Sequence, residues 1–361
     1  MDSDLMRIES FAPDEDGRAA FEAVRGQGIG PPASDPARGP APRCAPPPDA
    51  RCLVAWRGDE PVARCSFQVV EGLHGAPGRS GLVGHYEAAD ASAGIALLKD
   101  AQQRLAAAGV ERVLGPMNGS TWARYRLALP SLPGDPEFAP PVFMTEPQNP
   151  FDYPEQFAAA GFSVAAQYES RIDVNPGAVR PGAAALRDRL ASRGITVRSL
   201  CLDRYEDELE AIFALSRAAF AGNLYYTPIE LTAFRAMYER IRPLIDPDLV
   251  RLAHDAGYPL AGERLVGFLF AFPDPLSAGG GPPTRVVAKT GATAPEARRF
   301  GIGMHLLDQV RELAWEKGYQ AVIHALMYVA NDSMKSSSRH ESLLFRRYAL
   351  YEWKPERWVS R

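Results

Sequence analysis

An arginine and two glycines near the carboxyl end of the chain have the types and spacing that bind a phosphate group. The motif is Arg298-x-x-Gly301-x-Gly303, and it follows a short apolar run at 286–288. Glycine lets bare backbone N–H groups approach an anion, and the dipole of a helix that starts there favours negative charge. We therefore predict that the backbone of residues 299–304 holds a phosphate or pyrophosphate.

The elements around this motif follow the order strand, loop, helix, strand. Apolar residues recur after the motif at three- and four-residue steps, which predicts an amphipathic helix. They are Met304, Leu307, Val310, Leu313 and Ala314. Lys317-Gly318 ends this helix, and residues 321–326 have the pattern of a second buried strand. Glycines thus stand where a loop becomes a helix, as an anion site requires.

The spacing does not match two other nucleotide-binding motifs. A dinucleotide-binding loop needs glycine at the third position after Gly303, where this chain has Leu306, so a nicotinamide-dependent oxidoreductase is not favoured. A Walker loop needs Gly-Lys-Ser/Thr, which the motif lacks.

Arg298-x-x-Gly301-x-Gly303 after a strand resembles the acyl-CoA pyrophosphate loop of the GNAT N-acetyltransferase superfamily, whose pattern is Gln/Arg-x-x-Gly-x-Gly/Ala. Asn331, just past the next strand, matches a frequent asparagine of that family that faces the pantetheine arm, and a helix N-cap is its alternative role. The resemblance covers 195–353. It implies acetyl-CoA or another acyl-CoA as co-substrate, no metal, and these coenzyme-binding residues: Arg298, Arg299, Phe300, Gly301, Ile302, Gly303, Met304 and Asn331.

The first half of the chain repeats this order more weakly. A strand at 81–87, a helix at 93–108 and a strand at 110–114 precede Asn118, so 51–172 resembles a degenerate GNAT domain. Residues 89–94 lack both the Gln/Arg and the two glycines of the phosphate loop. We therefore expect one coenzyme site, in the second half.

The predicted fold class is α/β, an α+β mixed sheet in two tandem GNAT-like acyl-CoA N-acyltransferase domains. The expected boundaries are 1–175 for the degenerate domain with a Pro-rich loop at 26–50, 176–194 for a linker with a short helix, and 195–361 for the coenzyme-binding domain. In the latter, helices are expected at 205–220, 230–241 and 333–347.

Family chemistry is direct attack of an amine on the thioester, helped by strand amides, a base and an acid. His324 on the second strand is a candidate base, with a packed core histidine as its alternative. Tyr328 faces either cleft or core. Phe345 stands where the family has its proton-donating tyrosine, so Tyr348 or Tyr351 is the candidate acid.

Two further segments are candidates for binding the acceptor. Tyr225 and Tyr226 lie in a loop that walls the acceptor pocket in the family, and ordinary partly buried aromatics are the alternative. Asn118 and Arg124 lie in a polar-aromatic segment that either builds a binding surface or joins the two domains. We expect a cleft between two adjacent GNAT-like sheets.

The whole chain is compatible with this assignment. Its 361 residues favour two domains, and 46% hydrophobic and 23% charged residues are typical of a globular protein. A net charge of −4 gives no global attraction to nucleic acid. The apolar run 265–272 is too short to span a membrane. The acidic N-terminus lacks the apolar core of a signal peptide. We predict a cytoplasmic acyltransferase acting on a small-molecule or peptide amine. A non-catalytic acyl-CoA-binding or regulatory protein is the alternative.

Overall fold

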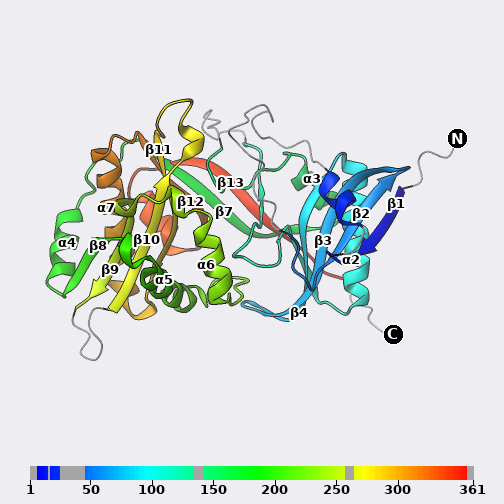
Figure 1. The fold of residues 1–361 in the computed structure, drawn as a ribbon, viewed down its shortest axis with the longest axis horizontal. Helices are drawn as coiled ribbons and strands as arrows, with labels where there is room; N and C mark the ends of the chain where they lie inside the picture. Colours follow the sequence, from blue (N-terminus) through cyan, green and yellow to red (C-terminus); the bar gives the residue numbers. More distant parts are fainter. Residues whose placement is uncertain (1–5, 15–16, 25–44, 133–141, 257–263, 356–361) are drawn as a thin grey trace.

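Two successive sets of strands and helices build the fold (Figure 1). The computed structural model describes residues 6–14, 17–24, 45–132, 142–256 and 264–355, so the predicted Pro-rich loop lies outside the described residues as far as residue 44. The first half contains β1 (Met6–Phe11), α1 (Arg18–Ala23), β2 (Arg51–Arg57), β3 (Glu60–Leu73), β4 (Ala76–Ala88), α2 (Ala91–Ala107), β5 (Arg112–Gly115), β6 (Leu127–Ala128), α3 (Tyr153–Ala159) and β7 (Ser163–Asp173).

The second half begins with an additional helix, α4, and then follows a related order. Its elements are α4 (Ala183–Ala191), β8 (Ile195–Ser199), α5 (Tyr205–Phe220), α6 (Leu231–Glu239), β9 (Val250–Asp255), β10 (Arg264–Pro273), β11 (Arg285–Thr293), α7 (Ile302–Glu316), β12 (Ala321–Tyr328), α8 (Asp332–Ser338) and β13 (Leu343–Trp353). Short 3-10 helices join them: η1 (Leu202–Arg204), η2 (Arg242–Leu244), η3 (Pro247–Leu249), η4 (Pro275–Ser277) and η5 (Pro295–Phe300).

The two halves repeat one pattern. In the first, β4 leads through α2 to β5, which pairs with β4 in parallel; in the second, β11 leads through α7 to β12, which pairs with β11 in parallel. Each half then adds a short helix, α3 or α8, and a long last strand, β7 or β13. This confirms the predicted mixed α/β fold built from two similar halves.

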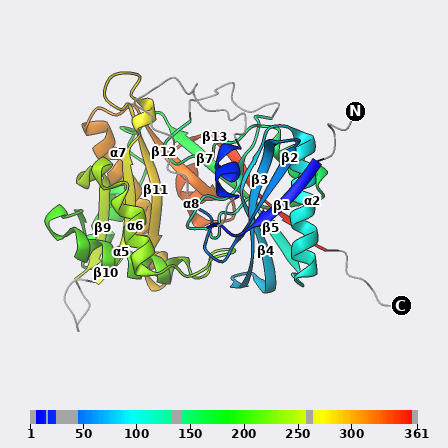
Figure 2. The same ribbon diagram turned by 45° about the vertical axis from the view of Figure 1, so that its right-hand side comes forward.

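The last strand of each half lies beside the other half. β13 pairs with β5 of the first half and β7 pairs with β12 of the second, while β7 and β13 pair with each other. One sheet therefore runs in the order β1-β2-β3-β4-β5-β13-β7-β12-β11-β10-β9-β8. Figures 1 and 2 show β7 and β13 crossing the middle of the molecule. The two adjacent sheets expected from the sequence are therefore joined into one.

The helix expected over 333–347 was also wrong beyond residue 338. α8 ends at Ser338, after the run Ser336-Ser337-Ser338, and serine is a weak helix former because its hydroxyl competes for the backbone. Leu343–Trp353 form β13, where Tyr348, Ala349 and Leu350 are buried consecutively. A strand covered on both faces has a continuous apolar run, which periodicity does not separate from a buried helix.

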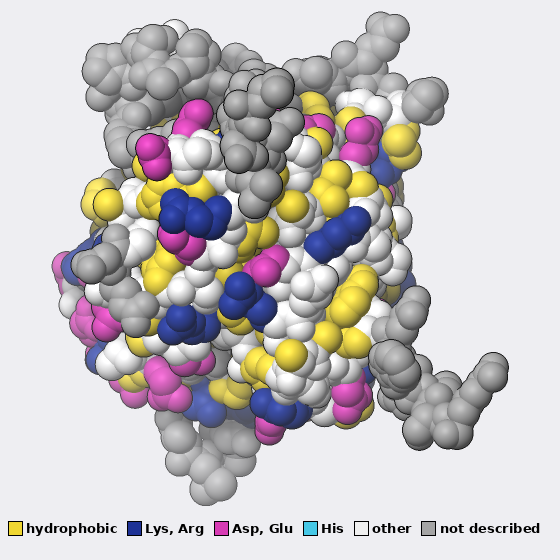
Figure 3. Space-filling view, turned by 90° about the vertical axis from the view of Figure 1, so that its right-hand side faces the viewer, with side chains coloured by type: hydrophobic (Ala, Val, Ile, Leu, Met, Phe, Trp, Pro, Cys, Tyr) yellow, Lys and Arg dark blue, Asp and Glu magenta, His cyan; other side chains and the backbone are white. Residues whose placement is uncertain are grey.

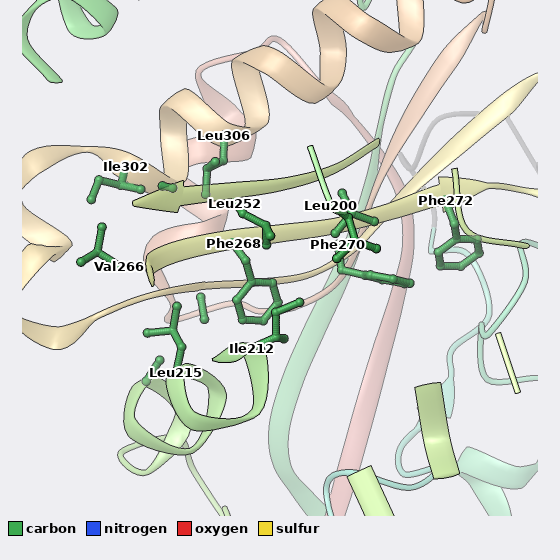
Figure 4. Close-up of a cluster of buried hydrophobic side chains, with 14 of the residues drawn as sticks. Leu200, Ile212, Leu215, Leu252, Val266, Phe268, Phe270, Phe272, Ile302 and Leu306 are labelled. Carbon is green, nitrogen blue, oxygen red and sulfur yellow. The ribbon is translucent and has the colours of Figure 1, made fainter. Parts of the chain in front are cut away.

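Helices cover both faces of the second half of the sheet. Ile212 and Leu215 of α5 pack below Phe268 of β10, while Ile302 and Leu306 at the start of α7 lie above it (Figure 4). Because this first turn of α7 is anchored in the core, the loop that precedes the helix has a defined position.

The end of the molecule formed by the first half carries charges of both signs, interspersed with apolar side chains (Figure 3). None of the described helices is long and apolar enough to cross a membrane. Among the described residues, no group of three or more His, Cys, Asp or Glu is placed to hold a metal ion.

Candidate active site

The two parallel strands of the second half pair over only part of their length. The register runs from Arg285 opposite Ala321 to Ala288 opposite His324, and no pair follows in the described ladder. Lys289 is an extra residue in β11, because Ala288 and Thr290 oppose consecutive residues of β10. β12 has its own irregularity beyond His324. Such bulges bend strands and are common beside functional sites, so β11 and β12 stop pairing at this point.

The predicted phosphate loop lies just beyond this point. η5 leads into Gly301, which has a φ of 86°, and α7 starts at Ile302. No side chain of the described residues caps this helix start. The first N–H groups of a helix lack partners within it, and the exposed Gly303 leaves its backbone accessible. A Cβ at Gly303 would meet only the Thr293 hydroxyl, at 3.5 Å. This helix start is open to an anion.

The predicted coenzyme-binding side chains have different surroundings. Arg298 is exposed and donates from Nη2 to the carbonyl oxygen of Ala219 at the end of α5, at 2.7 Å. Arg299 is exposed, with its guanidinium 5.0 Å from the centroid of the Phe300 ring. The side chains of Ile302 and Met304 are buried in the core, so only their backbone is available to a ligand.

Asn331 occupies the N-cap position of α8 without making a side-chain capping bond, and it is exposed. The structure therefore brings its free side chain to the end of β12. Its two predicted roles are not exclusive in this position, since the backbone caps the helix while the amide faces solvent.

His324, in the middle of β12, is buried beside Ser337 and His340. Its Nδ1 lies 2.7 Å from the Ser337 hydroxyl, and its ring centroid is 6.1 Å from that of His340. Burial, together with the charges of Arg311 and Arg171, lowers the pKa of His324 to about 3. A base this weak is neutral at pH 7 but has little affinity for a proton.

Two of the three tyrosine candidates, Tyr328 and Tyr348, lie near each other across β7. Tyr348 and Tyr328 both have Tyr168 as a register partner. Tyr348 is fully buried and donates its hydroxyl to Glu146 at 2.6 Å, and burial raises its pKa well above the usual value. Tyr328 is partly exposed, with its ring 5.4 Å from that of Tyr168. Of the two hydroxyls, that of Tyr348 is already committed to a carboxylate.

Tyr225 and Tyr226 join the α5–α6 loop to the first half. The backbone N–H of Tyr225 donates to the carbonyl of His74 at 2.8 Å, and the N–H of His74 donates to the carbonyl of Tyr226 at 3.3 Å. Tyr225 adopts a φ of 60° and is buried. Tyr226 also borders a surface groove of about 550 Å³ between α5 and the start of α6. The loop is thus held by the β3–β4 hairpin.

The polar-aromatic segment of the first half reaches the same loop. Trp122 donates from Nε1 to the carbonyl of Thr227 at 2.9 Å, and its ring packs against Tyr226 at 6.0 Å between centroids. Arg124 is exposed, and Asn118 accepts a hydrogen bond within the first half. Of the two roles predicted for the segment, Trp122 fills the joining role.

The strand position in the first half that corresponds to Lys289 is closed by the chain itself. The register between β3 and β4 shifts at His85, whose backbone N–H donates to Oδ1 of Asn118 at 2.7 Å. Met117 donates to the carbonyl of Val83 at 2.8 Å. A Cβ added at Gly84 would come within 2.3 Å of the Met117 carbonyl oxygen. Residues 117 and 118 therefore occupy the space beside the β4 bulge.

The helix start in the first half is closed as well. Asp90 is the N-cap of α2, and its carboxylate accepts from the backbone N–H of Ala93 at 3.0 Å. Burial opposes ionisation, but bonds from Ser92, Ala93 and Arg57 outweigh it and lower the pKa of Asp90 to about 2. A permanent negative charge stands where a phosphate would bind.

Lys289, near the end of the β11–β12 pairing, was missed from the sequence, and Arg126 belongs to the predicted polar-aromatic segment but had no separate role predicted for it. Lys289 is the bulge residue of β11, and Arg126 of the first half donates to the carbonyl of Leu326 in β12 at 3.0 Å. The sequence does contain a signal for Lys289, because a lysine inside the otherwise apolar strand RVVAKTGAT is unusual. The sequence does not indicate that Arg126 reaches β12, because Leu326 lies 200 residues away in the chain.

Solved structures share this architecture. The sequence matches no protein-family model and no curated protein. A conserved protein from Enterococcus faecalis, described as a probable N-acyltransferase, superimposes with a TM-score of 0.56 at 8% identity, covering 97% of this chain and 72% of that one. A tandem GNAT protein from the clavulanic acid biosynthesis pathway gives 0.50 at 14% identity, covering 98% and 100%.

A third similar structure is a fungal multi-domain GH3 β-N-acetylglucosaminidase with a GCN5-related glucosamine N-acetyltransferase region. It gives a TM-score of 0.52 at 12% identity over 97% of this chain, which spans 38% of the length of the fungal enzyme. The chain therefore has the tandem GNAT fold that its phosphate-loop motif predicts.

Proposed function

We propose that the protein is an acyltransferase that moves an acetyl or other acyl group from acyl-CoA to an amine. One contrast between the two halves carries the proposal. α7 starts at an exposed, uncapped glycine turn, whereas α2 starts at the carboxylate of Asp90. Uncapped helix starts bind phosphate, and a capping carboxylate repels it. We therefore expect each chain to bind one coenzyme A, in its second half.

In this proposal the backbone N–H groups of 299–304 bind the pyrophosphate, and Arg298 adds positive charge. Asn331 contacts the pantetheine arm, which runs toward the point where β11 and β12 stop pairing. The acceptor amine enters from the side of the α5–α6 loop, bounded by Tyr225 and Tyr226. The amine attacks the thioester carbon, and the thiolate of coenzyme A leaves without an acyl-enzyme.

Proton transfer is assigned to Tyr328 and solvent. Tyr328 is partly exposed, and its ring lies 5.4 Å from that of Tyr168 between centroids. His324 bonds to Ser337 and Tyr348 to Glu146, so both candidates have structural partners. The same observation favours the second candidate function, a protein that binds acyl-CoA without turnover.

Two measurements test these functions together. Titration calorimetry with coenzyme A tests binding, and an amine library incubated with acetyl-CoA and screened for free thiol tests turnover. Binding with amine-dependent thiol release supports the acyltransferase. Binding with no release from any amine supports the non-catalytic protein, and absence of binding overturns both.

A further inference from the structure

Two cations approach the point where β11 and β12 stop pairing: Lys289 follows Ala288, the last paired residue of β11, and Arg126 donates to the carbonyl of Leu326, two residues beyond His324 in β12. Lys289 is partly buried in the β11 bulge, and Arg126 is 8% exposed. Neither pairs with a carboxylate among the described residues, and Arg126 is the one charged group whose field acts appreciably on Lys289 there. Buried charges in proteins are normally paired, because removing them from water is costly. An unpaired buried pair of like charge therefore calls for a partner from outside the chain.

Lys289 differs from every other lysine of the protein. The others are Lys99, Lys317, Lys335 and Lys354. The last three form ion pairs with Asp246 and Asp248, with Asp332 and with Glu352, respectively. Lys99 is exposed on α2. Burial and then repulsion by Arg126 lower the pKa of Lys289 to about 7, so both effects favour its neutral form and a bound anion would favour its charged form.

Arg126 is fixed in position by the first half. Its guanidinium lies 3.8 Å from the ring centroid of Tyr125 and 4.0 Å from that of Tyr168, and Nη1 donates to the carbonyl of Leu326. Its Nε is buried without a hydrogen-bond partner. Its backbone has a φ of 74°, a conformation that non-glycine residues adopt at some cost. A strained, rigid arginine with a spare donor is preorganised for an acceptor oxygen.

We propose that Lys289 and Arg126 bind a carboxylate group of a substrate. The inference rests on the proposed acyl transfer and names the substrate class of that site. A carboxylate offers oxygens to both donors and neutralises the pair. It is carried either by the acceptor amine or by the acyl group of a dicarboxylic acyl-CoA. A polycationic acceptor without an acidic group is excluded, since both residues would repel it.

Matched substrates separate the two sources. Acetyl-CoA is assayed with amino acids and with their amides, which keep the amine and lose the carboxylate. Succinyl-CoA is compared with acetyl-CoA on one neutral amine. We expect the carboxylate member of one series to have a kcat/KM about tenfold to a hundredfold higher, the range for a hydrogen-bonded charge.

Three variants assign that preference to the site. Lys289→Met should raise KM for the carboxylate substrate, so that the ratio of kcat/KM between the carboxylate and neutral substrates falls to about one. Lys289→Arg keeps a positive charge and should restore part of that ratio. Lys99→Met, which removes an exposed lysine, should leave the ratio unchanged. Neutral substrates that perform as well as their carboxylate partners would overturn the proposal while leaving acyl transfer intact.

A binding measurement tests the site without turnover. Carbon-13 labelling at lysine Cε gives few signals, and Lys289→Met assigns that of Lys289. Its titration midpoint is measured in chloride, in acetate and in acetamide at constant ionic strength, and then with succinyl-CoA and the amino acids. We expect a carboxylate probe to raise the midpoint by about one pH unit, while acetamide leaves it in place. A midpoint that no carboxylate moves refutes the inference, whether or not the protein is an enzyme.

Discussion

The side-chain oxygen of Asn118 accepts a hydrogen bond from the backbone N–H of His85 at 2.7 Å. The bond joins the segment after β5 to the bulge of β4, where a second GNAT-like site would place its acyl group. Asp90 caps the following helix in the same half. The first half thus satisfies internally the backbone donors that an acyl-CoA would need.

Stoichiometry is the first test of this closure. We expect calorimetry to give one coenzyme A per chain, because Asp90 occupies the helix start of the first half. Replacing Asp90 with Ala removes the capping carboxylate and should cost about 0.5–2 kcal/mol of stability without creating a site. A second site of similar affinity in the unaltered protein would contradict the prediction.

Gly303 provides the cleanest test of the phosphate loop. Gly303→Asp places a carboxylate at the start of α7, which stabilises a helix by about 0.3–1 kcal/mol but repels phosphate. We expect coenzyme A affinity to fall at least about tenfold, a change of about 1.4 kcal/mol, while the melting temperature does not fall.

Gly303→Ala is its matched control. The family pattern tolerates alanine at this position, and an added Cβ has room beside Thr293. Gly301 is a poorer choice, because its φ of 86° strains any side chain. Equal coenzyme A affinities for the Asp and Ala variants would show that the phosphate does not bind at this helix start.

The start of α7 after Gly301 and the repeated order of elements were predictable because their signals are local. Gly301 and Gly303 show where a loop becomes a helix, and the helix predicted at 205–220 is α5. The strand exchange was not predictable. β7 and β13 are long last strands in equivalent places of the two halves, and no pattern within either strand specifies which half it will pair with. The hydrogen bond from Arg126 to the carbonyl of Leu326 in β12 depends on that arrangement, since Arg126 comes from the first half.

The buried histidines predict acid sensitivity. Burial lowers the pKa of His324 to about 3 and that of His340 to about 4, from 6.5. Below pH 6.5 the unfolded chain therefore binds more protons than the folded one. Stability is complete above that pH and falls by about 1.4 kcal/mol per pH unit for each histidine as the pH drops toward 4.

Urea unfolding at pH 5, 6, 7 and 8 measures this dependence. His324→Asn keeps a polar partner for Ser337 but does not titrate, so its stability should fall less steeply below pH 6.5. His74→Asn, at an exposed position, should follow the unaltered protein. Parallel curves for His324→Asn and the unaltered protein would show that His324 does not contribute.

Tyr348→Phe separates a structural from a chemical role for that hydroxyl. Glu146 accepts from both Tyr348 and Arg346 at 2.6 Å, and it is 3% exposed. Loss of one bond to a buried charge should cost about 1.5–3 kcal/mol of unfolding free energy. We expect turnover per folded molecule to change little. A loss of kcat of a hundredfold or more in folded protein would instead make Tyr348 the proton donor.

The contacts of Trp122 with the α5–α6 loop indicate how the first half influences binding of the acceptor. Its ring packs against Phe220, Tyr226 and Phe234, and its indole N–H holds the carbonyl of Thr227. Trp122→Phe keeps an aromatic ring and removes the hydrogen bond, which is worth about 0.5–1.5 kcal/mol. The α5–α6 loop should become more mobile, so KM for the acceptor should rise about twofold to tenfold.

Coenzyme A affinity should be unchanged in Trp122→Phe, because Trp122 bonds to Thr227 and packs against Phe220, Tyr226 and Phe234, which lie outside the loop at 298–304. Trp315→Phe, at a position 58% exposed on α7, controls for the loss of an indole. Calorimetry and steady-state kinetics on the three proteins separate the effects. If KM for the acceptor stays constant while coenzyme A affinity falls, the first half supports the coenzyme site and not the acceptor loop.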